Sequence, residues 1–175
     1  MKKGFTLIEL LIVIGIISIL ATAVVLVLNP AQLLAQARDS TRISDLSSVK
    51  SAIGLYLATA DTPTLGIIAY STASTTCGLS GSVCTVRNIY TVDNTGWVGV
   101  DLTGTSGGST LASLPKDPTN SATYQYAYIG SNALKTFELN GTLESTKYVG
   151  MMASTTDGGN NDSYYEVGTD PGLNL

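Results

Sequence analysis

Residues 1–28, MKKGFTLIELLIVIGIISILATAVVLVL, decide the fold of this chain. An apolar run extends from Phe5 to Leu28 and contains one acid, Glu9. As a helix this run would measure about 36 Å, which is enough to cross a hydrocarbon core of about 30 Å. It is too long for the core of a cleaved secretory signal. The stretch therefore predicts a membrane anchor, with the two lysines before it on the cytoplasmic side.

Glu9 does not fit an ordinary anchor, because an ionisable side chain inside a span costs about 3 kcal/mol and usually marks a partner or a function. It follows Phe5 by four residues, which would place both side chains on one helix face. If the chain were cut between Gly4 and Phe5, the new amino group would be a cation at that depth. Glu9 would then pair with this amine, in its own chain or in a neighbouring one.

Residues 2–13, KKGFTLIELLIV, resemble the class III leader and N-terminal helix of type IV pilins and type II secretion pseudopilins. The resemblance implies cleavage after Gly4 by a prepilin peptidase and methylation of the Phe5 amine. It also implies that Glu9 guides each subunit into a helical filament of identical copies. Such a subunit is a single-pass protein of the cytoplasmic membrane until an inner-membrane assembly platform moves it into an extracytoplasmic or cell-surface filament.

The composition narrows the range of functions. The 175 residues carry a formal charge of −4, and without the two lysines of the leader seven basic residues remain against thirteen acidic ones. An acidic chain without basic clusters argues against direct binding of nucleic acid. There is no histidine, and neither cysteine has an evident activating partner. We therefore expect no enzyme.

Asn29 and Pro30 interrupt the apolar run. Since proline lacks a backbone donor, either the helix kinks or unwinds here, or Pro30 starts a fresh helix capped by Asn29. Residues 30–61 read as an amphipathic helix that Asp61-Thr62-Pro63 ends. Its apolar stripe has spacings of three and four residues: Leu46, Val49, Ile53 and Leu57.

Charged side chains of this helix lie off the stripe: Arg38, Asp39, Arg42, Asp45 and Lys50. We expect them to form a solvated face in the free subunit, with a weak i, i+3 pair between Arg42 and Asp45. In a filament the same face would meet neighbouring subunits, and its mixed charges would set their register.

The remaining residues, 62–175, read as a β-rich head. We expect loop over 62–82, short strands at 87–93 and 96–102 with Trp97 covering the core, and a flexible loop at 104–109. Asn140-Gly141 predicts a hairpin with a type I′ turn.

Three tyrosines alternate at 124, 126 and 128, after a proline-rich turn at 114–120, which would put three rings on one strand face. The turn and the tyrosines also resemble, more weakly, the head of the major pseudopilin.

The predicted fold is α+β. A long N-terminal helix, transmembrane in its first half and amphipathic in its second, would pack on a small antiparallel sheet, as in the pilin fold. The predicted boundaries are a leader at 1–4, a span at 5–29, the amphipathic helix at 30–61 and the head at 62–175.

Cys77 and Cys84 bracket a glycine- and serine-containing segment, CGLSGSVC. Disulfides persist on the outer side of the membrane, so we expect the pair to staple a loop. Two cysteines without histidine are too few for a metal site, and the spacing is not that of a CxxC redox motif.

The segment DGGNND at 157–162 is the only plausible ligand site in the sequence. Its oxygen-bearing side chains, Asp157, Asn160 and Asp162, on a glycine loop would suit a hard cation such as Ca²⁺. The spacing and the closing glutamate of an EF-hand are missing, and such segments are commonly plain turns. We expect no cofactor to be required, and keep Ca²⁺ at these residues as a hypothesis.

The function that these observations favour is a structural filament subunit, cleaved, N-methylated and polymerised through its apolar helix. The alternative is a membrane-tethered extracytoplasmic binding protein that does not polymerise. Within the filament class, a minor subunit at the tip is a third hypothesis, although Glu9 favours a repeating shaft subunit. The leader does not separate a surface pilus from a secretion pseudopilus.

Overall fold

The computed structural model describes residues 4–79, 81–105 and 107–175, and the chain divides into two compact units, Met1–Ala35 and Gln36–Leu175. The first unit contains helix α1, Leu7–Leu28, and the start of helix α2, Pro30–Thr59. The second contains the rest of α2 and the head. The two lysines of the leader lie outside the described residues.

Asn29 separates α1 from α2. Its backbone is left-handed, with φ of 42°, which ends α1. Pro30 is the first residue of α2, and the amide of Gln32 donates to both the carbonyl (2.9 Å) and Oδ1 (3.4 Å) of Asn29. Of the two alternatives, the fresh helix that starts at Pro30 and is capped by Asn29 is therefore confirmed.

The head contains one five-stranded sheet in the order β2-β1-β3-β4-β5. Its strands are β1, Tyr70–Ser71; β2, Thr85–Val86; β3, Tyr126–Ser131; β4, Thr136–Gly141; and β5, Tyr165–Gly168. The prediction of an α+β, pilin-like fold is confirmed. The sheet is mixed, however, since β1 and β2 run parallel while all other pairs are antiparallel.

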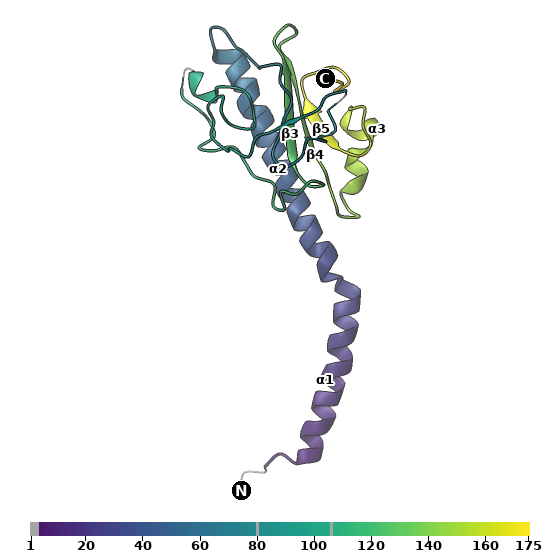
Figure 1. Ribbon diagram of the computed structural model, residues 1–175. Coiled ribbons are helices and arrows are strands. Elements are labelled where there is room, and N and C mark those ends of the chain that lie inside the picture. Colours follow the sequence, from purple (N-terminus) through teal and green to yellow (C-terminus); the bar gives the residue numbers. More distant parts are fainter. Residues whose placement is uncertain (1–3, 80, 106) are drawn as a thin grey trace. The chain divides into compact units, whose positions relative to one another are not determined.

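In the described part of the head, three short helices complete the fold: η1, Leu102–Gly104; η2, Val149–Met152; and α3, Ser154–Asp157. Figure 1 shows β3, β4 and β5 side by side, with α3 next to β5.

The core lies between α2 and the sheet. Leu46, Val49 and Ile53 of α2 have no exposed surface, and Leu57 is partly buried against the same core, which confirms the predicted apolar stripe. Against them pack the buried side chains of Trp97, Tyr126, Tyr128, Phe137 and Leu139. The Trp97 indole donates to the Pro115 carbonyl at 3.0 Å, so its one polar group is satisfied inside the core.

Polar bonds also hold the two tyrosines of β3 in place. Tyr128 donates to the Leu65 carbonyl at 2.6 Å, and Tyr126 to Asp45 of α2 at 2.8 Å. Tyr124 precedes β3, so the prediction of three rings on one strand face holds for two of them.

The strands predicted at 87–93 and 96–102 are wrong. The apolar residues of these segments, among them Trp97, Val98 and Val100, are buried in the core without forming strands. Their backbones are joined by isolated hydrogen bonds, such as the one that the Trp97 amide donates to the Ile89 carbonyl at 2.9 Å. Asp93 accepts the Thr95 amide at 3.1 Å, and this turn stops a ladder from forming.

The hairpin turn predicted at Asn140-Gly141 is also wrong, because both residues lie inside β4 and pair with β3 and β5. Gly141 serves another purpose there: a Cβ on it would lie 3.0 Å from a methyl group of Leu46. The β3–β4 connection is four residues long, 132–135, and ends at Lys135 with φ of 56°.

Candidate processing and assembly site

The first turn of α1 is organised by Thr6 and Glu9. Thr6 is the N-cap, and Glu9 Oε2 accepts hydrogen bonds from both the Thr6 amide (2.8 Å) and the Thr6 hydroxyl (2.7 Å). In return the Glu9 amide donates to Thr6 Oγ1 at 3.3 Å. This is a capping box, which satisfies backbone donors that a helix start otherwise leaves free.

Phe5 stands just before the cap, with 82% of its surface exposed. Since the helix begins at Leu7, Phe5 and Glu9 do not share a helix face as predicted. Gly4 is equally open, because a Cβ built on it would meet no atom within 4 Å. The peptide bond between Gly4 and Phe5 thus lies outside the helix, between two exposed residues, directly before the cap.

Both Thr6 donors reach the same oxygen of Glu9, Oε2. Among the described residues, the other oxygen, Oε1, has no hydrogen-bond donor. The cap thus holds the carboxylate at the helix start through one of its two oxygens.

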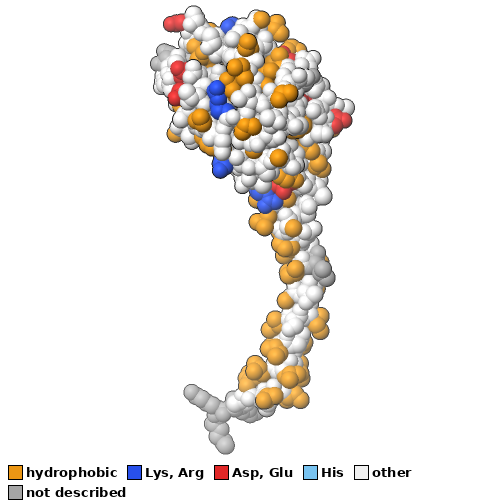
Figure 2. Space-filling view, in the orientation of Figure 1, with side chains coloured by type: hydrophobic (Ala, Val, Ile, Leu, Met, Phe, Trp, Pro, Cys, Tyr) orange, Lys and Arg blue, Asp and Glu red, His pale blue; other side chains and the backbone are white. Residues whose placement is uncertain are grey.

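Beyond this turn, α1 has no charged side chain and is apolar except at Ser18 and Thr22. Leu7–Val25 has a mean hydropathy of 2.7 and is long and apolar enough, by length and composition, to cross a membrane. Figure 2 shows hydrophobic side chains following one another along this helix. The hydroxyls of Ser18 and Thr22 donate hydrogen bonds to the carbonyls four residues earlier, at 2.7 and 2.9 Å. The helix therefore presents no unsatisfied hydroxyl at these two positions to an apolar surrounding.

The sequence interpretation missed a second cluster, in which Arg42 is the central residue. Its guanidinium is fully buried and pairs with Asp117 (2.7 Å), Asp39 (2.8 Å) and Glu144 (2.7 Å). Arg38 holds the same Glu144 at 2.6 Å. The prediction of a solvated charged face is therefore wrong for Asp39 and Arg42.

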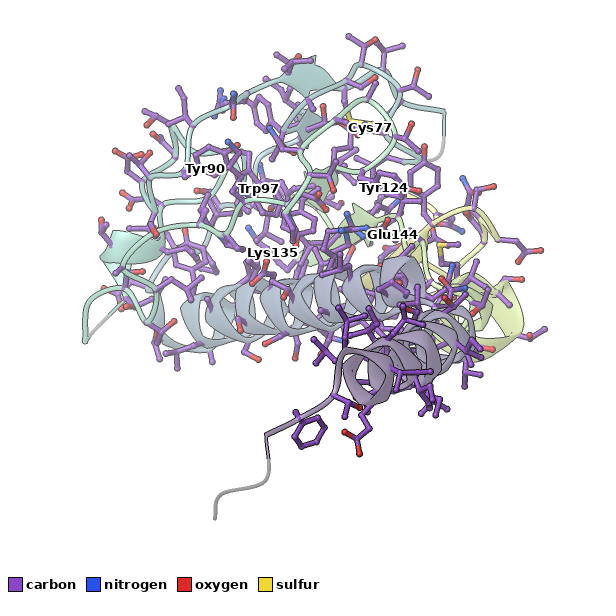
Figure 3. All side chains as sticks on the ribbon, turned by 90° about the horizontal axis from the view of Figure 1, so that it is seen from below. Cys77, Tyr90, Trp97, Tyr124, Lys135 and Glu144 are labelled. Atoms are coloured by element: carbon purple, nitrogen blue, oxygen red, sulfur yellow. A yellow bond between two sulfur atoms is a disulfide. The ribbon has the colours of Figure 1, made fainter. Side chains whose placement is uncertain are left out.

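Other contacts complete this cluster. Arg42 also donates to Thr119 at 3.1 Å and lies over the Tyr124 ring, 4.8 Å from its centre. Asp39 accepts the amides of Glu144 and Ser145, at 3.1 and 2.8 Å. The cluster thus fastens two head segments to α2; Figure 3 shows Tyr124 and Glu144 at the same end of this helix.

The predicted pair between Arg42 and Asp45 is wrong as well, since Asp45 accepts from Tyr126 instead. A signal for the cluster was present in the spacing. Asp39, Arg42, Leu46 and Val49 follow one another at intervals of three, four and three, so the two charged residues continue the apolar stripe toward the helix start.

The electrostatics of the cluster follow from these contacts. Hydrogen bonds from Arg38 and then Arg42 outweigh burial and lower the pKa of Glu144 to about 2. Burial alone would lower the pKa of Arg42, but its bonds to Asp117 and Glu144 raise it above the ordinary value. Burial raises the pKa of Asp45, partly offset by the hydrogen bond from Tyr126. Arg42 and Glu144 thus favour each other's charged form.

Cys77 and Cys84 form the predicted disulfide, and both are buried. They belong to a small apolar cluster on the face of the sheet away from α2, with Ala69, Leu79, Ala127 and Ile129. Leu175 packs against this cluster from the C-terminal segment.

The carboxylates of the predicted calcium loop bind backbone amides. Asp157 accepts from Gly159 (2.9 Å) and Glu166 (3.1 Å), and Asp162 accepts from Ser154 (2.8 Å). Asn160 contributes its own amide, which donates to Glu166 at 2.8 Å. Within the described ranges, no three His, Cys, Asp or Glu side chains come together as metal ligands.

Comparison with known proteins identifies the N-terminal segment. Residues 1–25 match the family model described as the prokaryotic N-terminal methylation motif. No curated protein and no solved structure matches the chain. The matched segment contains the exposed Gly4–Phe5 peptide bond, the capping box of Thr6 and Glu9, and most of the apolar helix. The chain therefore carries the class III prepilin leader, the signature of type IV pilins and pseudopilins.

Proposed function

We propose that this protein is the structural subunit of a type IV pilus-like filament. It is cleaved after Gly4, N-methylated at Phe5 and polymerised into a helical filament of identical copies. The observation that carries this proposal is the methylation motif at residues 1–25, continued by an apolar helix with exposed side chains. The partners are a prepilin peptidase and methyltransferase, an inner-membrane assembly platform and other copies of the chain.

The surface of α1 suits both states of such a subunit. In lipid, a helix satisfies its own backbone hydrogen bonds, and here two hydroxyls are satisfied as well. In a filament, the same apolar side chains pack against those of other copies and stay dry. An assembly motor can therefore move the subunit from one state to the other without leaving this helix in water.

Glu9 supplies the specific contact. After cleavage, the Phe5 amine of one subunit is a cation in an apolar surrounding, where it needs a partner. Thr6 holds the Glu9 carboxylate at the helix start through Oε2. The amine of a neighbouring subunit then binds at Oε1, and this pairing sets the axial position of the incoming subunit.

The mass of the N-terminal peptide, from protein isolated from its own host, tests processing directly. We expect a peptide that starts at methylated Phe5. A mature pool that retains Met1 would leave the Phe5 nitrogen in a peptide bond, where it cannot pair with Glu9. That result would overturn the proposal and favour a membrane-tethered binding protein.

Variants of the first turn test assembly. Glu9→Gln retains an acceptor for the Thr6 amide and removes only the charge, whereas Thr6→Ala removes the capping hydroxyl and keeps the charge. We expect Glu9→Gln and Glu9→Ala to insert in the membrane normally and to form few filaments. Thr6→Ala should reduce assembly less. Filaments in normal number from Glu9→Gln would contradict the proposed pairing.

A further inference from the structure

Two carboxyl groups are buried on the face of the sheet away from α2. Glu138 of β4 and Glu166 of β5 have no exposed surface. The strands pair so that Asn140, two residues after Glu138, lies opposite Glu166. Since side chains two residues apart on a strand lie on the same face, Glu138 and Glu166 are diagonal neighbours on this face of the sheet.

Each carboxyl group uses one oxygen to hold a separate part of the chain. Glu138 Oε2 accepts the amide of Leu175 at 3.0 Å. Glu166 Oε2 accepts the amides of Asn160 and Asn161, both at 2.8 Å. A Cβ on Gly159 would lie 2.0 Å from this same oxygen, so the loop backbone lies directly on the carboxyl group.

The other oxygen of each group has no donor. Glu138 Oε1 and Glu166 Oε1 are buried without a hydrogen-bond partner, as are both polar atoms of the Asn140 amide. A buried acceptor that lacks a donor is unfavourable in a dry site, and a proton on one of these two carboxyl groups supplies a donor there.

The surrounding charges do not compensate for two carboxylates. Across the described residues, every ion pair involves Arg38 or Arg42, and none reaches Glu138 or Glu166. The neighbouring ionisable groups are acids. Asp157, at the end of α3, accepts the Glu166 amide. Asp170, before the C-terminal segment, accepts from Thr136 and Asn174.

Strand β3 and the disulfide loop add no charge to this face of the sheet. They contribute Ala127, Ile129 and the segment 77–84, which contains no ionisable side chain other than the bonded cysteines. A second negative charge would therefore have no cation near it.

We propose that Glu138 and Glu166 share one proton, and that this proton fastens the 159–161 loop and the C-terminal segment to the sheet as a pH-sensitive latch. Burial, and then the adjacent Glu166, raise the pKa of Glu138 to about 7. Burial is also the main cause that raises the pKa of Glu166. The proposal stands on the head alone and is independent of the filament role.

The sign of the pH dependence follows from the raised pKa. The folded head keeps a proton that the unfolded chain releases near the ordinary glutamate pKa of 4.5. The stabilisation is complete below about pH 4.5 and is lost as the pH rises through about 7. Above that, two like charges face each other in a buried site, which weakens the bonds to Leu175 and to the loop. Release is local, because the core around α2 does not contain this pair.

The test uses the full chain in detergent micelles. In a ¹³C NMR titration of labelled glutamate, a carboxyl carbon of the native protein should titrate near pH 7. This titration should be absent in Glu138→Gln. Hydrogen exchange of the Leu175 amide is corrected for base catalysis against Ile53, a core residue of α2. We expect the opening equilibrium of the Leu175 amide to rise by up to about tenfold per pH unit between about pH 4.5 and pH 7, and to level off above pH 7. In Glu138→Gln, which keeps the hydrogen bonds without the charge, it should not change with pH. Asp61→Asn, which removes an exposed charge, should behave as the native chain.

Three results would overturn the latch. One is glutamate carboxyls that all titrate below pH 5. Another is a pH dependence of Leu175 exchange that is unchanged in Glu138→Gln. The third is a titration midpoint that moves on addition of Ca²⁺ or Mg²⁺, since a metal ion would then occupy the place of the proton. If Glu138→Gln does not fold, the native titration and Glu166→Gln decide.

Discussion

The guanidinium of Arg42 donates two hydrogen bonds to the carboxylate of Asp117, which lies 75 residues further along the chain. Nε reaches Oδ2 at 2.7 Å and Nη2 reaches Oδ1 at 3.2 Å, with both side chains fully buried. This two-pronged pairing is rigid and directional, unlike apolar contact. It holds a loop of the head at one place on α2, where the apolar stripe alone would permit sliding.

Removing Arg42 should therefore destabilise the head. Arg42→Met keeps the length of the side chain but leaves Asp39 and Asp117 without a cation, while Glu144 keeps Arg38. We expect the free energy of unfolding to fall by about 3–5 kcal/mol, as for other broken buried ion pairs. Chemical denaturation of the full chain in micelles measures this. Lys50→Met, an exposed site on the same helix, is the control and should change stability by less than about 0.5 kcal/mol. Equal effects would show that Arg42 contributes no more than a surface charge.

Acid should loosen the same cluster. Hydrogen bonds from Arg38 and Arg42 lower the pKa of Glu144 to about 2, so the folded head holds fewer protons than the unfolded chain. This contribution is present above about pH 4.5 and is lost as the pH falls toward 2. Thermal melting of the full chain between pH 6 and pH 2 should show the decline. Glu144→Gln should flatten it, and an equally steep decline in that variant would assign the effect to other carboxyls.

The sequence predicted those parts of the fold that depend on local pattern. The apolar span, the stripe from Leu46 to Ile53, the buried Trp97 and the disulfide follow from periodicity, composition and spacing. The Arg42 cluster could not be identified, because Asp117 and Glu144 become partners only when distant segments meet. The hairpin turn predicted at Asn140-Gly141 was wrong because the role of this glycine also depends on a distant segment. A glycine that permits a turn also permits close packing, and here Leu46 lies above it.

Close packing predicts the effect of a methyl group on β5. A Cβ on Gly168 would lie 2.1 Å from the Phe137 carbonyl of the paired strand. Gly168→Ala must push the two strands apart, so we expect a loss of about 1–3 kcal/mol in denaturation. Gly150→Ala is the matched control, since a Cβ there meets no atom within 4 Å. Equal stability of the two variants would mean that β5 can move away without loss.

The disulfide should stabilise the head modestly. Cys77 and Cys84 are seven residues apart, and closing so short a loop contributes about 2–3 kcal/mol through the unfolded state. We expect the Cys77→Ser, Cys84→Ser double variant to unfold at correspondingly lower denaturant, with the same secondary structure by circular dichroism. Loss of the native spectrum would instead indicate that the bond is needed to reach the fold.

Calcium should not affect stability. Asp157 and Asp162 each accept backbone amides, and among the described residues no third acidic side chain joins them as a metal ligand. We expect the melting temperature of the full chain to be the same in Ca²⁺ and in a chelator. A rise with Ca²⁺ that disappears in Asp157→Asn would support the cation site at Asp157, Asn160 and Asp162.

The position of Leu175 over the disulfide cluster has a kinetic consequence. A reductant can attack only a sulfur atom that it can reach, and both cysteines are covered in the closed head. Because Leu175 packs against the cluster that contains both cysteines, the half-life of the bond in a thiol buffer depends on how often this face of the head opens. Reduction kinetics therefore measure a local opening that leaves the core around α2 in place.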